Sequence, residues 1–98
     1  MGVMVVGVLQ ITLALPPTSS LKAKRSVMRK LVSRTRNRFA ISIAEVDELD
    51  NLSVGVIGVA VVSNSRRFVN SLIDQIVESV DELELARIAD HQFEIMNY

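Results

Sequence analysis

The chain has no cysteine, so disulfide bonds, thiolate metal sites and a cysteine nucleophile are all excluded. This lack also fits a reducing, cytoplasmic setting. The single histidine, His91, is too few for a histidine-based metal cluster. Aromatic residues make up only 4% of the 98 residues, so a folded core must be mostly aliphatic. We therefore expect one small domain, spanning residues 1–98, that carries no metal and no cofactor.

Acidic residues are missing from the first 44 residues of the chain. Residues 1–44 hold eight cations and no acid, whereas residues 45–98 hold three cations and all eleven acids. The net charge of zero is therefore a cancellation between two halves of opposite sign. Such a division favours an anionic partner for one surface, or self-association between opposite surfaces.

A targeting segment is not expected at the N-terminal run "MGVMVVGVLQITLAL". No Lys or Arg precedes Lys22, and the run is interrupted by Gln10 and Thr12. It lacks the basic region of a signal peptide and is too short to span a bilayer. A buried strand is the better interpretation, in a protein without a membrane contact.

The order of periodic segments predicts a βαββαβ domain. Strands are expected at 3–13, 40–48, 52–63 and 83–96, because these segments are rich in β-branched and apolar residues. One helix is expected from a cap at Ser20 to about Arg38, and a second after "SNS" with its apolar face from Val69 to Val80. Two right-handed split βαβ units then give a ferredoxin-like α+β sandwich. Its four-stranded antiparallel sheet carries both helices on one face.

The two central strands lack the alternation that a half-exposed sheet should show. In the first strand, Met4, Val6 and Val8 alternate with other apolar residues, and segment 52–63 behaves in the same way. A bare apolar sheet face is rare in a monomer. We therefore predict a homo-oligomer in which a second copy covers the open face. A charge at Val6 or Val61 should disrupt it, depending on which of them faces outward.

The first helix is basic over most of its surface. At about 100° per residue, four cations fall on one flank and form a ridge: Lys22, Arg25, Arg29 and Arg36. Lys24 falls inside the apolar arc and is expected to extend its ammonium group past the helix end. These charges could serve solubility alone, or pair with acids elsewhere. Alternatively, the free N–H groups at the helix start could bind a phosphate or carboxylate together with Lys22, Lys24 and Arg25.

A longer polyanion could follow the same flank. The predicted anion- or RNA-binding residues are Lys22, Lys24, Arg25, Arg29 and Arg36. The central strands carry no aromatic residue for base stacking, so any RNA contact should be made to phosphates, with little sequence preference.

Catalytic patterns are weak. The acids around the expected turn, from Glu45 to Asp50, have no EF-hand spacing and suit a solvated turn. His91 has no obvious nucleophile near it in the sequence, and Ser19, Ser20 and Ser26 suit caps or a helix surface. We therefore do not expect an enzyme.

Three segments carry a resemblance to a known family. "SLKAKRSV", "RFAISIAEVDELD" and "GVAVVSNS" resemble, in order and spacing, the YlxP-like family of small bacterial proteins (domain of unknown function 503). The resemblance implies a ferredoxin-like fold, a bacterial cytoplasmic protein and no established activity. Members are often encoded beside translation and ribosome-maturation factors, which hints at RNA or ribosome association.

The chain departs from the family pattern at three places. Ala23 replaces a usual Glu, Leu52 and Ser53 replace Trp and Gln, and Ser65 replaces Asp. Without the Glu, the helix start is more positive. Our leading hypothesis is a non-catalytic accessory protein that binds RNA or the ribosome through the first helix. The alternatives are a self-associating module that meets a protein partner and a regulator that binds a small anion.

Overall fold

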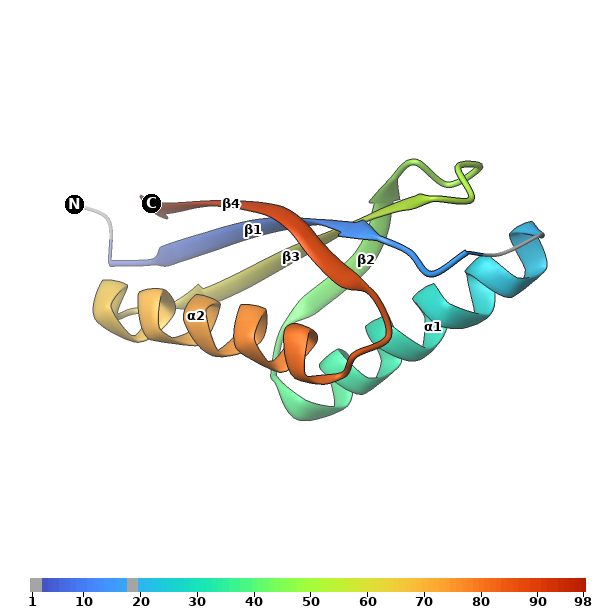
Figure 1. Ribbon diagram of the computed structural model, residues 1–98. Helices are drawn as coiled ribbons and strands as arrows, with labels where there is room; N and C mark the ends of the chain where they lie inside the picture. The colour runs from blue at the N-terminus through green and yellow to red at the C-terminus, as the bar shows by residue number, and fades with distance from the viewer. Residues whose placement is uncertain (1–2, 18–19) are drawn as a thin grey trace.

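The computed structural model describes residues 3–17 and 20–98, and the predicted ferredoxin-like fold is confirmed (Figure 1). The elements follow in the order β1 (Val5–Ala14), α1 (Leu21–Arg38), β2 (Ser42–Asp47), β3 (Val54–Ser63), α2 (Arg66–Glu82) and β4 (Arg87–Asn97). The four strands form one antiparallel sheet in the order β2-β3-β1-β4. Both helices lie on the same face of this sheet (Figure 1).

The two helices cover different halves of the sheet. Helix α1 packs on the β2 side, whereas α2 packs on β1, β3 and β4. Ser20 is the N-cap of α1, as predicted, because its Oγ accepts a hydrogen bond from the backbone N–H of Ala23 at 3.1 Å. Ser65 caps α2 in the same way, accepting from the N–H of Phe68 at 3.1 Å. Each helix therefore starts where a serine follows a break in the apolar pattern.

The core is aliphatic, as the low aromatic content predicts. Among the described residues, the buried hydrophobic set holds valine, leucine, isoleucine, methionine and alanine, and no aromatic side chain. Glycine permits close approach at two strand positions. A Cβ at Gly7 would lie 2.4 Å from Val69 Cγ1, and one at Gly55 would lie 2.6 Å from Met28 Sδ. Both positions therefore suit glycine, because a side chain there would require its neighbour to shift.

The structure settles which side chains face outward. Val61 is buried against the helices, so a charge there would disrupt the core, whereas Val6 lies half-buried on the opposite face. The strand limits also differ from the prediction: Leu52 precedes β3, and β4 starts at Arg87 rather than at residue 83. Residues 83–86 instead form the turn after α2, in which Glu84 takes a positive φ of 54°.

Candidate nucleic-acid interface

Helix α1 presents a row of exposed cations along one flank. We call Lys22, Arg25, Arg29 and Arg36 the basic ridge, and each of these side chains is exposed. Lys30 and Arg34 are also exposed, further round the helix, and α1 contains no acid. The ridge therefore presents positive charge to solvent over most of the length of α1. Whether it binds an anion stays a prediction.

The ridge runs beside the β2 edge of the sheet. Nη2 of Arg36 donates a hydrogen bond to the backbone oxygen of Ile43 in β2, at 2.8 Å. Arg25 and Arg29 border a small hollow of about 150 Å³ together with Glu45 of β2. A linear polyanion on the ridge would thus lie along the outer edge of the sheet.

Lys24 does not belong to this exposed surface. Its side chain is 0% exposed, so the prediction that its ammonium group reaches solvent is wrong. The reason is a local partner: Nζ lies 3.2 Å from Oε2 of Glu45 and donates to the backbone oxygen of Glu48. A buried ammonium group is tolerated in the interior when an acid and a carbonyl oxygen compensate its charge and accept its hydrogen bonds. Lys24 is therefore not part of the surface that an anion could reach.

The Lys24–Glu45 contact is a close ion pair without good hydrogen-bond geometry. Oε2 of Glu45 is buried and accepts no hydrogen bond within the described residues, although it lies 3.2 Å from the ammonium nitrogen. The distance establishes the charge interaction, because Coulomb attraction depends on separation more than on angle. This pair joins the start of α1 to β2, and the bond to Glu48 joins it to the β2–β3 turn.

Arg38, at the end of α1, faces the second helix. Nη1 donates to Oγ of Ser79 at 3.0 Å and lies 3.9 Å from Oε2 of Glu82. The eight cations of residues 1–44 are therefore divided: Lys24, Arg36 and Arg38 bond to other elements of the fold, and the other five are exposed. The sequence pattern alone did not separate these two groups.

The acidic turn between β2 and β3 is ordered by its own hydrogen bonds. Oδ1 of Asp47 accepts from the N–H of Glu48 at 2.7 Å, and Oε2 of Glu48 accepts from Nδ2 of Asn51 at 3.0 Å. Glu48 has a positive φ of 58°, as turns often require. Within residues 3–17 and 20–98, no group of three or more His, Asp or Glu side chains is arranged to hold a metal ion.

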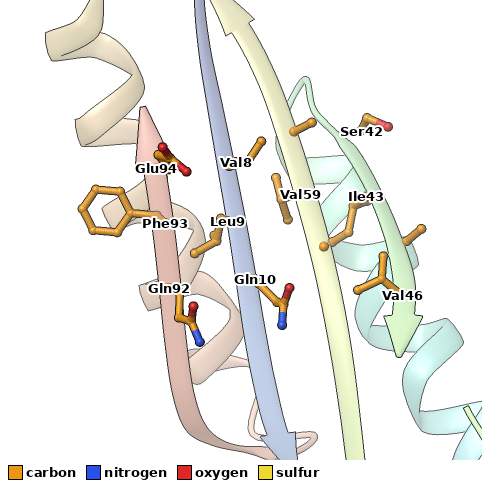
Figure 2. A pocket seen from close by; sticks show the side chains of 13 residues that line it. Val8, Leu9, Gln10, Ser42, Ile43, Val46, Val59, Gln92, Phe93 and Glu94 are labelled. Carbon is orange, nitrogen blue, oxygen red and sulfur yellow. The ribbon is translucent and has the colours of Figure 1, made fainter. Parts of the chain in front are cut away.

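The open face of the sheet carries a shallow hollow of about 540 Å³ (Figure 2). Small residues of β2 and β3 form part of its floor: Ala44, Gly58 and Ala60. Gln10, Gln92 and Glu94 add polar groups on the β1 and β4 side. The valines of this face differ in exposure: Val56 is only 4% exposed, whereas Val62 is 64% exposed. The face is thus less bare, and more polar along β4, than the sequence suggests; its use as an oligomer contact stays a prediction.

A sequence comparison identifies the family. The profile of a family described as "Protein of unknown function (DUF503)" matches residues 6–93. The chain belongs to this family. It is 32% identical over 62 residues to the uncharacterized protein YlxP of Bacillus subtilis (strain 168), covering 63% of this chain and 67% of the relative. The descriptions of the DUF503 family and of this relative name no function.

Solved structures resemble this DUF503 protein in fold only. The de novo designed protein Foldit4 has a TM-score of 0.50 at 12% identity, with 97% of this chain and 96% of the other covered. A putative antibiotic biosynthesis monooxygenase from Nitrosomonas europaea has a TM-score of 0.48 at 12% identity, covering 100% and 92%. Neither likeness supports an activity for the DUF503 chain. In the described residues, neither helix is both long enough and apolar enough to cross a membrane.

The start of α1 allows a direct test of its charge. Position 23 is exposed in the first turn, which contains no acid. We expect Ala23→Glu to raise the free energy of unfolding by about 0.5 kcal/mol, because a carboxylate there interacts favourably with the helix dipole. Urea denaturation would measure the gain. Ala23→Gln is the matched control without charge, and an equal gain in both variants would contradict the dipole explanation.

Proposed function

We propose that this protein is a non-catalytic accessory protein that binds structured RNA through the phosphate backbone, with the basic ridge of α1 as the contact surface. The observation that supports this most directly is the set of exposed cations on a helix without acids. Phosphate contacts supply most of the affinity in binding that does not depend on sequence. Strands β1 and β3 contain no aromatic residue. The central strands therefore offer no aromatic side chain on which RNA bases could stack.

The ridge has features that suit a polyanion more than a single small anion. Its cations are spread from Lys22 to Arg36, fourteen residues along α1, which is about 21 Å at 1.5 Å per residue. Lys24, which would have completed a compact cluster at the helix start, is buried. Charges spread along a rod match phosphates along a strand better than one phosphate group.

Salt dependence of RNA binding tests the proposal. The probe is a hairpin RNA prepared from ribosomal RNA, in filter binding at several salt concentrations. If the ridge neutralises about four phosphates, log affinity should fall against log salt with a slope of about −3 to −4. Arg25→Ala and Arg29→Ala should each reduce the steepness by about one and leave sequence preference unchanged.

The matched control uses cations of the other helix. Arg66 and Arg67 are exposed in the first turn of α2, so Arg66→Ala with Arg67→Ala removes the same kind of charge from another place. We expect this double variant to bind nearly as the wild type does. Binding that is absent at low salt would contradict the proposal. So would binding that survives the combined replacement of Lys22, Arg25 and Arg29 by Ala. Retention on an acidic protein but not on RNA would favour the protein-partner alternative.

A further inference from the structure

The two edges of the sheet are protected to very different degrees. Strand β2 has six residues and a register shift between Glu45 and Asp47, and Arg36 covers the Ile43 carbonyl. Strand β4 has eleven residues and pairs with β1 without irregularity from Asp90 to Asn97. Among residues 3–17 and 20–98, no hydrogen bond covers the outer backbone of β4. It also contains no Lys and no Pro, the residues that commonly block an edge strand.

The phase of the β1–β4 ladder shows which groups of β4 are available. The N–H of Tyr98 donates to the oxygen of Met4 at 2.7 Å, in line with the Asn97–Val5 register. In an antiparallel ladder, successive residues turn their N–H and C=O groups alternately to the two sides. The even-numbered residues from 92 to 98 therefore bond to β1. The odd-numbered residues His91, Phe93 and Ile95 direct their backbone groups outward.

Phe93 lies in the middle of this free segment. Its side chain is 49% exposed, so its ring is available for contact with another molecule. Figure 2 shows its ring extending beyond β4, on the side away from β1. An outward backbone position and an exposed ring at the same residue make it a natural centre for strand pairing.

We propose that two copies of this chain pair through their β4 edges, antiparallel, with the two-fold axis at Phe93. The two sheets, each of four strands, would then form one continuous sheet with the helices of both copies on one face. Phe93 pairs with its own copy, and His91 pairs with Ile95 of the other chain. Because the two-fold axis repeats the His91–Ile95 pair, there are three outward pairs in all. Each exchanges two backbone hydrogen bonds, so the contact has about six between the chains.

Charge disfavours two of the registers next to Phe93. An axis at Gln92 sets Asp90 directly opposite the second copy's Glu94 at two symmetric places. An axis at Glu94 sets Glu94 against itself. An axis at Phe93 instead places Glu94 opposite Gln92 and Asp90 opposite Met96, so no acid faces an acid. Since like charges directly opposite each other destabilise a sheet, the Phe93 register is favoured over these two, and it centres the contact on the outward segment from His91 to Ile95.

This arrangement leaves the basic ridge free. Helix α1 packs on the β2 side of the sheet, at the opposite edge from β4. Pairing at β4 therefore neither covers the ridge nor depends on RNA binding. The open face, whose use in self-association the sequence predicts, also stays uncovered, so the two kinds of assembly can be told apart by experiment.

Single-cysteine variants test the contact directly, because the chain has no cysteine of its own. Opposed residues of a hydrogen-bonded antiparallel pair have Cα atoms about 5.5 Å apart, within the range that a disulfide can bridge. Oxidised Phe93→Cys should therefore run as a disulfide-linked dimer on a non-reducing gel. Val62→Cys, on the open face and 64% exposed, should form no disulfide and run at the size of one chain on the same gel. Cross-linking of Val62→Cys alone would overturn the proposal in favour of stacked sheet faces.

Sedimentation of variants gives a second readout. The wild type should sediment at micromolar concentration as twice 10.8 kDa. Phe93→Pro should sediment at 10.8 kDa, because proline removes the outward N–H and the ring while the edge position tolerates it. Phe93→Lys provides a second disruption without a backbone change. Val62→Glu is the control and should remain dimeric. A wild type of only 10.8 kDa, or a Phe93→Lys variant that is still dimeric, would overturn the proposal.

Discussion

Replacing Glu45 by Gln should lower the free energy of unfolding by about 3 kcal/mol, a large fraction of the stability of a small domain. The ammonium group of Lys24 is fully buried, and Glu45 is its one acidic neighbour within ion-pair distance among the described residues. Removing one member of a buried pair leaves an uncompensated charge in the interior. We expect the lower end of the usual range because the Glu45 side chain retains 20% exposure. Urea denaturation with an unchanged m-value would measure the loss.

A double-mutant cycle separates the pair from its surroundings. Lys24→Met should also destabilise, by about 2 kcal/mol, since it leaves the Glu45 carboxylate partly buried without a cation. The combination of Lys24→Met with Glu45→Leu should recover most of the loss, because two apolar side chains of similar size leave no buried charge.

The exposed pair between Arg38 and Glu82 provides the matched control. Their side chains are 61% and 59% exposed and their nearest atoms lie 3.9 Å apart. Glu82→Gln should therefore change stability very little, as is usual for surface ion pairs. If Glu45→Gln proved as neutral as Glu82→Gln, the buried pair would have no stabilising role.

Gly7→Ala should destabilise the protein by about 2–3 kcal/mol, through overpacking. The added methyl group would lie 2.4 Å from Val69 Cγ1 and 3.1 Å from Val61 Cγ1. Both valines are buried, and β-branched side chains have little freedom to turn away. For a domain of this size, the melting temperature should fall by roughly 8–20 °C. Adding Val69→Ala should restore part of it, because the clashing methyl groups are then absent.

Gly58→Ala is the control for this prediction. A Cβ there would lie 2.9 Å from Val46 Cγ1, but Val46 is exposed and can shift toward solvent. Replacing Gly also lowers the entropy of the unfolded chain, which stabilises by a few tenths of a kcal/mol or more. We expect Gly58→Ala to be close to neutral. Equal losses in the two variants would mean that backbone conformation, and not the contact with Val69, decides the cost.

The fold could be predicted because the helices show a clear 3.6-residue periodicity and the strands are rich in β-branched residues. The helical spacing of Met28, Leu31 and Thr35 matches the buried side of α1. The cap residues Ser20 and Ser65 directly precede the two helices. The strand ends were less accurate, since the turn after α2 carries apolar residues such as Leu83 and Leu85 that extend the strand pattern. Local pattern therefore fixes element type better than element limits.

The candidate site was predicted less well, for a physical reason. The position of Lys24 in the apolar arc indicates that it points inward, but whether its charge stays there depends on a carboxylate twenty-one residues later. The alternation of Ile41, Ile43 and Glu45 in fact places Glu45 on the helix-facing side of β2. An inward acid and an inward cation in segments expected to pack together were a signal for the ion pair. The bond from Arg36 to a main-chain carbonyl left no such signal.

The central place of β1 has a consequence for the synthesis of the chain. Its partners are β3 and β4, and β4 begins at Arg87, seventy-three residues after β1 ends at Ala14. At about 5–20 residues per second, a ribosome takes roughly 4–15 s to add that length. For this time the segment VVGVLQITLA, rich in β-branched residues and without charge, has an unpaired edge. The nascent chain thus exposes an uncharged, aggregation-prone strand early and pairs its second edge only with β4, so protection by chaperones should matter most before β4 emerges.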